Sequence, residues 1–160
     1  MQGQAITNDK YFDDFIVGEK FVSPSRTVTE TDLSMFNMIS GDWHPVHSDE
    51  EYAKGTVFGT RIVSGIFGIA LMTGLSGKFG VFDRSVVAML SLEDWLFHKP
   101  IMVGDTLHIE MTIVDKRLTS KGDRGVIDRK YFVLNQRGEV VQEGRSKAMV
   151  LRGPPGPPKA

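Results

Sequence analysis

The sequence contains no cysteine in its 160 residues. Disulfides, zinc sites with thiolate ligands and cysteine nucleophiles are therefore all excluded. A chain without cysteine fits a reducing compartment, so we expect a cytoplasmic location.

The sequence also lacks an excess of charge of either sign. Basic residues number 19 and acidic residues 20, so the formal net charge is -1. No overall field draws the chain to nucleic acid or to an anionic membrane surface, and we expect neither as a partner. The most apolar window, residues 62–75, is shorter than the roughly 20 residues that cross a bilayer. Residues 1–10 lack the apolar core of a secretory signal.

The remaining composition is typical of one folded domain. Hydrophobic residues make up 41% of the chain and charged residues 24%, which is the balance of a globular protein, and the length suits a single domain. We expect a flexible N-terminus over residues 1–10, one domain over residues 11–152, and a disordered Pro/Gly tail over residues 153–160, where the repeated prolines cannot continue a strand.

Two short helices are predicted in the first third of the chain. A motif similar to a capping box opens a helix over residues 29–40, which Gly41 ends. Residues 42–47 should form a shaped loop, because Pro45 disfavours a helical conformation at the residue before it. Another N-cap pattern then opens a brief helix over residues 48–55.

A third, very apolar helix is predicted from Ser64 to about Phe79. No charge occurs in it before Lys78, so it should be buried on nearly every side. Three glycines interrupt it, each costing about 1 kcal/mol relative to alanine in a helix interior. Something should therefore approach the helix backbone closely at Gly65, Gly68 and Gly74.

The rest of the chain has the pattern of β-strands. Five segments rich in Val, Ile, Leu and Phe are predicted strands: residues 21–28, 85–97, 107–118, 126–135 and 140–151. Turn sequences between consecutive segments predict hairpins and hence antiparallel pairing. We expect an α+β fold in which a five-stranded antiparallel sheet wraps around the long apolar helix as its core.

Asp42 and His47 are the candidates for acid–base chemistry. On a turning backbone that contains Pro45, their five-residue offset can place a carboxylate and an imidazole on two sides of one water molecule. An Asp after a Gly is equally well explained as a cap or turn residue, and a loop His as a partly exposed side chain. Asp42, His44 and His47 also resemble metal ligands, but Pro45 removes the helical face that such a pair of histidines needs, and we expect no metal.

The start of the apolar helix, at Ser64 and Gly65, is a second candidate feature. Free N–H groups and the positive end of the helix dipole can bind a developing oxyanion there, and a glycine lets a ligand approach the backbone. The alternative is a plain cap at Ser64 with glycines that serve packing.

Together these segments resemble a known family, the MaoC-like (R)-specific enoyl-CoA hydratases, which have the hot-dog fold. The resemblance extends from Tyr11 to Leu151, and the following segments carry it: Phe36–His47 (FNMISGDWHPVH), Ala53, Phe58, Ile62–Gly65 (IVSG) and Lys99–Leu107 (KPIMVGDTL). The first segment is fairly specific, whereas the last one is shared with other hot-dog proteins.

The resemblance implies a hydro-lyase that adds water reversibly to a 2-enoyl thioester, giving an (R)-3-hydroxyacyl-CoA. It makes Asp42 and His47 the catalytic pair, the Gly65 N–H a donor to the thioester carbonyl, and Thr73 a small hydroxyl residue near the site. It further implies an acyl-CoA or acyl-carrier-protein substrate and no cofactor, since CoA belongs to the substrate. A homodimer or an assembly of dimers, with a tunnel at the interface for the pantetheine arm, is expected.

Two positions depart from the family pattern. The family usually has Asn at His44 and often has His at Ser64. His44 can still brace the loop through a ring nitrogen or can retune the site, and Ser64 leaves the helix-end backbone intact. Both departures bear on substrate preference.

Two other functions stay open. A hot-dog acyl-CoA thioesterase commonly has a carboxylate on the central helix, and here no Asp or Glu lies between Ile62 and Phe79. A non-catalytic acyl-CoA-binding or scaffold subunit is disfavoured by the intact Asp42 and His47, whereas His44 keeps it open.

Overall fold

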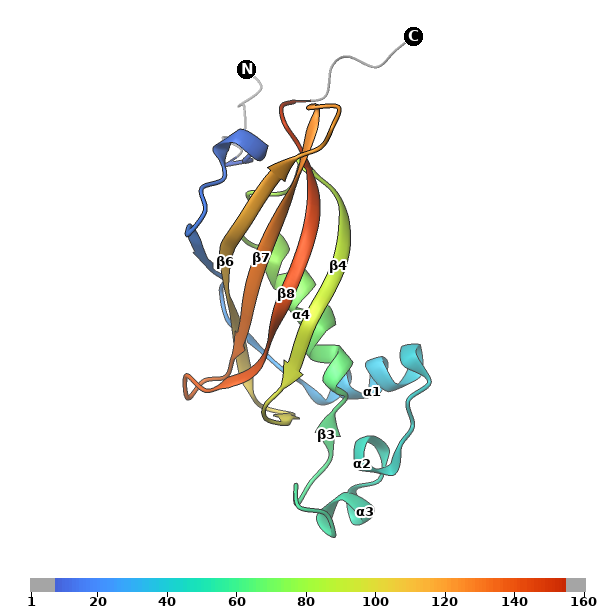
Figure 1. The fold of residues 1–160 in the computed structure, drawn as a ribbon. Coiled ribbons are helices and arrows are strands. Elements are labelled where there is room, and N and C mark those ends of the chain that lie inside the picture. The colour runs from blue at the N-terminus through green and yellow to red at the C-terminus, as the bar shows by residue number, and fades with distance from the viewer. Residues whose placement is uncertain (1–7, 155–160) are drawn as a thin grey trace, which may run out of the picture.

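The computed structural model describes residues 8–154 (Figure 1). Asp9 and Lys10, from the predicted flexible N-terminus, contact the domain. The Asp9 carboxylate accepts the Arg84 N–H at 3.0 Å, and the Lys10 N–H donates to the Val81 carbonyl at 2.9 Å. Residues 1–7 of the predicted N-terminal segment and residues 155–160 of the predicted tail lie outside the described residues.

One curved antiparallel sheet forms the body of the molecule, as predicted. Its strand order is β1 (Lys20–Val22), β6 (Thr106–Leu118), β7 (Arg124–Leu134), β8 (Val140–Leu151) and β4 (Val86–Phe97). The predicted first strand is divided, because β1 and β2 (Arg26–Thr27) pair separately with β6. Pro24 lies between them and has no N–H to give to the ladder. A small second sheet pairs β3 (Ile62–Val63) with β5 (Ile101–Met102).

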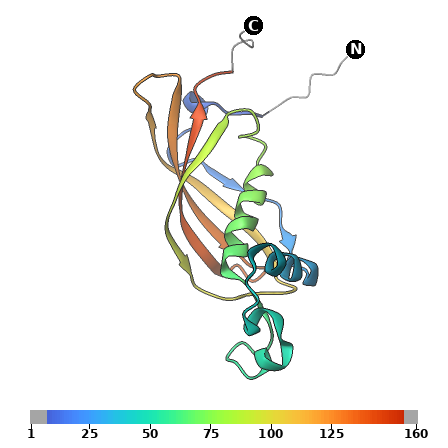
Figure 2. The same ribbon diagram turned by 90° about the vertical axis from the view of Figure 1, so that its right-hand side faces the viewer.

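The predicted apolar helix is α4 (Gly65–Gly77), and the sheet curves around it (Figure 2). Its buried side chains include Phe67, Leu71, Met72 and Leu75, which pack in one cluster with the inward-facing residues of β6 and β7. Burying one such side chain contributes about 1.5 to 3 kcal/mol. The prediction of a sheet wrapped around a central helix is therefore confirmed. None of the helices formed by residues 8–154 has the length and apolar character needed to span a membrane.

The helix glycines have different environments. A Cβ on Gly68 would lie 2.4 Å from Nε2 of Gln142, and one on Gly65 would lie 2.9 Å from the Phe97 ring. The Gln142 amide fills the space beside Gly68: it donates to the Gly65 carbonyl at 2.9 Å and accepts from the Trp95 indole at 3.1 Å. No atom lies within 4 Å of a Cβ placed on Gly74, so the prediction of a close approach is wrong at this glycine.

The segment between the first strands and α4 carries three short helices that extend beyond one end of the sheet (Figure 1). The first predicted helix is α1 (Glu30–Ser40), capped by the Thr29 side chain and ended by Gly41 at φ +72°. The second is α3 (Glu50–Lys54). The predicted loop is shorter than expected, because Pro45–Ser48 forms a helical turn, α2, with Pro45 in its first turn, where a missing N–H costs nothing.

Candidate active site

Asp42 and His47 face each other at the end of α1. Oδ2 of Asp42 lies 3.5 Å from Nε2 of His47. The left-handed Gly41 reverses the chain after α1, and Ser40 Oγ then accepts the Asp42 N–H at 3.2 Å. The His47 side chain is 12% exposed and the Asp42 side chain 40%, so the pair opens to the surface of the protomer.

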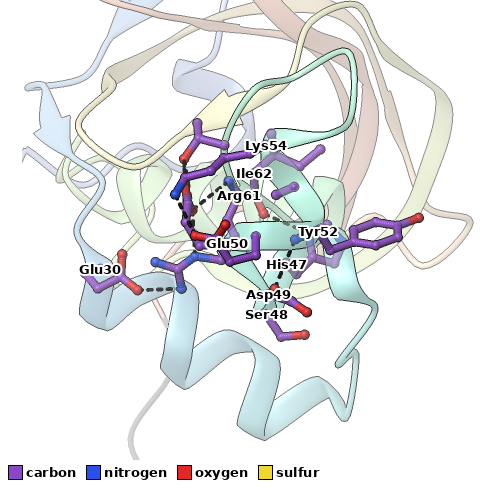
Figure 3. A network of polar contacts seen from close by, with 12 residues as sticks. Glu30, His47, Ser48, Asp49, Glu50, Tyr52, Lys54, Arg61 and Ile62 are labelled. Atoms are coloured by element: carbon purple, nitrogen blue, oxygen red, sulfur yellow. Dashed lines mark hydrogen bonds and ion pairs between the residues drawn. The ribbon is translucent and has the colours of Figure 1, made fainter.

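His47 is held from both sides. Its Nδ1 lies 2.7 Å from the Ile62 carbonyl (Figure 3), and the buried Asn37 amide donates to the His47 carbonyl at 3.2 Å. A carbonyl only accepts, so the ring hydrogen belongs on Nδ1. In the neutral ring Nε2 is then an acceptor, and it is directed at Asp42.

His44 braces the loop between the two residues. Ring atom Nδ1 of His44 accepts the Val46 backbone N–H at 3.3 Å and so caps α2. The backbone N–H of His44 donates to Oδ1 of Asp42 at 3.4 Å. The Ser48 hydroxyl closes the same turn by donating to the Trp43 carbonyl at 3.0 Å. Nδ1 of His44 is therefore used by the backbone of the loop.

An ion-pair network ties α1 and α3 to the chain that leads into α4 (Figure 3). Arg61 contacts Glu30 of α1 at 2.8 Å and Glu50 of α3 at 3.1 Å, and the Thr60 hydroxyl donates to Glu50 at 3.0 Å. The Arg61 N–H, the Thr60 hydroxyl and the Arg61 side chain hold the pKa of Glu50 below its usual value. Hydrogen bonds to Glu30 and Glu50 raise the pKa of Arg61. The network fixes the position of Ile62, whose carbonyl holds His47.

Ser64 and Gly65 form the N-terminal end of α4. The Ser64 side chain makes no capping bond, and no hydrogen bond found within residues 8–154 uses the Gly65 N–H. A cavity of about 320 Å³ lies beside this helix end, with Ile62, Gly65, Phe97 and Gln142 in its wall. Asp42 and His47 do not line the cavity. They connect to it through Ile62, whose carbonyl binds His47.

Thr73 does not join these residues within one chain. It lies eight residues beyond Gly65, about 12 Å along the helix axis. Its hydroxyl donates to the Ala70 carbonyl at 2.7 Å, and it lines a different cavity of about 460 Å³.

Three supporting features were not found from the sequence: Asn37, the Ile62 carbonyl and the Arg61 network. Asn37 could have been noticed in the sequence, because it follows Leu33 by four residues and so lies on the buried face of α1. A buried polar side chain needs a hydrogen-bond partner, which indicates a specific role. A backbone carbonyl has no signal in sequence, and Arg61 meets its partners only through the tertiary fold.

No group of three His, Asp or Glu side chains in the described part of the chain is arranged to hold a metal ion. Asp42, His44 and His47, which resemble metal ligands in the sequence, form no such group in the structure.

Comparison with known proteins defines the fold class first. A monoamine oxidase regulatory protein from Archaeoglobus superimposes with a TM-score of 0.83 at 34% identity, over 91% of this chain and 97% of that one. A double hot-dog protein of Mycobacterium tuberculosis gives a TM-score of 0.78 at 21% identity, over 95% of this chain and 47% of that one. The sheet wrapped around α4 is thus a hot-dog fold.

Sequence comparison then gives the family. The model of the MaoC-like domain matches residues 14–131. Protein MaoC of Klebsiella aerogenes is 36% identical over 120 residues, which are 75% of this chain but only 35% of that protein. The (R)-specific enoyl-CoA hydratase of Rhodospirillum rubrum is 30% identical over 145 residues, 88% of this chain and 91% of that enzyme. The chain belongs to the MaoC-like dehydratase family.

Proposed function

We propose that this protein is a hydratase that adds water reversibly to the double bond of a 2-enoyl-CoA thioester, with Asp42 and His47 as its catalytic residues. The observation that carries the proposal is the approach of Oδ2 of Asp42 to Nε2 of His47 at 3.5 Å, with His47 bound to the carbonyl of Ile62, three residues before α4 begins. Relatives named (R)-specific enoyl-CoA hydratase and 3-hydroxybutyryl-CoA dehydratase support the same reaction class.

The pair is suited to hold one water molecule. With its hydrogen on Nδ1, the neutral ring of His47 offers an acceptor at Nε2, and the Asp42 carboxylate offers another. Two acceptors this close cannot bond each other, but a water can donate one hydrogen to each. The lone pairs of that water are then free to attack an electrophilic carbon, which is the task of a general base site.

The reaction balances through this one water. Its oxygen bonds to C3 of the enoyl group, and one of its protons passes to the Asp42 and His47 pair. The π electrons move to give an enolate at C1, which collapses as C2 takes a proton from the pair. One water is consumed, and no cofactor beyond the CoA of the substrate is needed. Dehydration follows the same steps in reverse.

The Gly65 N–H is the proposed donor to the enolate oxygen. It is free of other partners within the described residues and lies at the positive end of the helix dipole. A preorganised donor of this kind is worth about 3 to 4 kcal/mol in the transition state. A side chain at this position would also meet the Phe97 ring at 2.9 Å.

A homodimer is the proposed working form. Strand β4 lies at the edge of the sheet and, among the strands of residues 8–154, pairs only with β8, so its other side presents backbone groups that no described strand pairs. Its exposed apolar side chains include Val87, Met89, Leu90, Leu92, Leu96 and Phe97. A second copy placed along this edge would cover them and enclose the partly exposed catalytic pair. Light scattering should give a dimer mass, and Leu90→Glu with Leu92→Glu should shift it toward a monomer.

Hydration of crotonyl-CoA, followed by loss of the enoyl absorbance, tests the activity. Asp42→Asn and His47→Gln should each lose two to four orders of magnitude in rate (about 10²- to 10⁴-fold). Asp123→Asn and His108→Gln are matched controls elsewhere on the molecule and should retain full activity. Full activity of either catalytic variant would overturn the assignment. Release of free thiol from a saturated acyl-CoA without hydration would favour a thioesterase, and binding without either activity a scaffold subunit.

A further inference from the structure

Arg129 is a buried guanidinium without a carboxylate partner. It lies in β7 on the face that packs toward α4, with 6% of its surface exposed. Its Nη2 donates to the Ser146 hydroxyl at 2.9 Å and its Nε to the Ser146 carbonyl at 3.3 Å. A guanidinium has five N–H donors, so three remain for another acceptor.

The neighbouring carboxylate does not serve Arg129. Successive residues of a strand point to opposite faces, and Asp128 pairs with Arg145 on the outer face of the sheet. Within residues 8–154 no Asp or Glu forms an ion pair with Arg129. Buried guanidinium groups are normally paired, because an unpaired buried charge is costly.

The guanidinium lines a cavity of about 460 Å³. The wall is otherwise mainly apolar, with Met72, Phe82, Val86 and Met89 among its members. One carboxylate, that of Asp83, also lines the cavity, but Asp83 is exposed to solvent and forms no ion pair with Arg129. The cavity therefore combines apolar walls with one buried positive charge.

The Tyr131 ring lies beside Arg129. The Ser76 hydroxyl donates to the Met72 carbonyl at 2.9 Å and lies 3.4 Å from the Tyr131 hydroxyl. The guanidinium carbon lies 5.5 Å from the centre of the Tyr131 ring and 5.6 Å from that of Phe82, so two aromatic rings fix its position.

The charge of Arg129 is poorly solvated in this place. Burial lowers the pKa of its guanidinium, and only Tyr131 and Asp128 act in the opposite direction. Arginine nevertheless stays charged in proteins. A planar anion with two oxygens would supply the missing acceptors, and a carboxylate matches the guanidinium geometry.

We propose that this cavity receives an acyl group that ends in a carboxylate, and that Arg129 selects this acyl group. The proposal rests on the hydratase function and specifies its substrate class as 2-enoyl-CoA thioesters of dicarboxylic acids. The apolar walls fit the methylene chain and the guanidinium fits its anionic end. Thr73 and Ser76 of this cavity lie about 12 to 17 Å along α4 from Gly65, so the carboxylate would lie far from the thioester.

The test compares matched pairs of 2-enoyl-CoA substrates of increasing length, one ending in a methyl group and the other in a carboxylate. For the unaltered protein, kcat/KM should favour the carboxylate by at least about tenfold at one or more lengths, the ratio expected for a charged hydrogen bond. Arg129→Met should abolish this preference while keeping activity on the methyl-ended substrates, and Arg129→Lys should restore part of it. Arg117→Met, at an exposed arginine of β6, should leave the preference unchanged.

Two results would overturn the proposal: no carboxylate preference at any length, or an equal loss on both substrate types in a folded Arg129→Met protein. Calorimetric binding of the saturated thioesters separates this inference from the proposed function. Absence of hydration with carboxylate-selective binding would refute the hydratase and support the anion site. Hydration without carboxylate-selective binding would support the hydratase and refute the anion site.

Discussion

The segment that carries the candidate catalytic residues and the body of the molecule are stabilised by different interactions. We call residues 41–62 the overhang. No residue between Leu33 and Val63 belongs to the buried hydrophobic cluster, which is built from the sheet, α4 and the segments that flank them. The overhang is held by polar contacts instead, chiefly the Arg61 network and the bond from His47 to the Ile62 carbonyl.

This difference predicts how the two regions respond to substitution. Packing changes in the body remove buried contacts and should lower the free energy of unfolding. Changes in the overhang should leave that free energy almost unaltered, because surface substitutions away from the core usually have effects within about 0.5 kcal/mol. Activity should show the opposite pattern: it should fall with changes in the overhang and depend less on packing changes in the body.

The largest expected effect is on activity, from the overhang. If Asp42 and His47 hold one water together, the double variant Asp42→Asn with His47→Gln should be no slower than the slower single variant, because residues that act as a unit are not additive. The melting temperatures of all three variants should match that of the unaltered protein. Losses that multiply in the double variant would show that the two residues act separately.

The next largest effect is on stability, from the body. Gly68→Ala places a Cβ 2.4 to 2.6 Å from the Gln142 amide and displaces a side chain that bonds both Gly65 and Trp95. We expect a loss of about 1 to 3 kcal/mol in the free energy of unfolding, the usual cost of overpacking. Urea denaturation measures it.

Gly74→Ala is the matched control for Gly68→Ala. It lies in the same helix with nothing within 4 Å of the added Cβ. Alanine is the better helix former, so a gain of up to about 1 kcal/mol is expected. Equal losses in both variants would mean that helix glycines matter for a reason other than packing against Gln142.

A smaller effect is expected from Arg61→Met in the overhang. Loss of the contacts with Glu30 and Glu50 should loosen the position of Ile62 and hence of His47, so kcat/KM should fall several-fold with little change in melting temperature. Lys54→Met removes an exposed ion pair with Glu51 in the same region and is the control. A large drop in melting temperature for Arg61→Met would contradict the view that the network positions the site rather than stabilises the fold.

The sequence predicted the body better than the overhang, for a physical reason. Alternation of apolar residues in β6 and the uncharged run of α4 report burial directly, so the sheet and its central helix could be predicted from local patterns. In the overhang Asp42 and His47 could be chosen as candidates, but their partners could not. The Ile62 carbonyl and the Arg61 contacts depend on segments that meet only in three dimensions.

Pro45 illustrates a limit of local reasoning. The effect of proline on the residue before it is correctly expected, since His44 is extended and outside the helix. The same proline is also a favourable first residue of a helix, and α2 begins there. Thr73 shows a different limit, because residue spacing alone does not determine which end of α4 lies nearer to Asp42 and His47.

The smallest expected effect concerns one carboxylate from each region. Asn135, Lys99 and Arg137 lower the pKa of Glu139, in the turn after β7, from 4.5 to about 2, and Glu50 in the overhang is lowered by Arg61 and Thr60. A carboxylate whose pKa is lower in the folded than in the unfolded protein stabilises the fold at pH values above its unfolded pKa. For Glu139 this stabilisation is lost as the pH falls from about 4.5 to the folded pKa of about 2. Both side chains are partly open to solvent, which screens their charges, so the change in stability should be slight.

Titration of the carboxyl carbons by NMR measures the two groups separately. Asn135→Ala should raise the midpoint of Glu139 and leave Glu50 unchanged, because it removes the largest stabilising contact of that carboxylate alone. Thr60→Val should raise the midpoint of Glu50 and leave Glu139 unchanged. A variant that moved both midpoints would mean that the overhang and the sheet are coupled electrostatically. Independent titration would mean that the overhang can be altered by acid without disturbing the sheet that supports it.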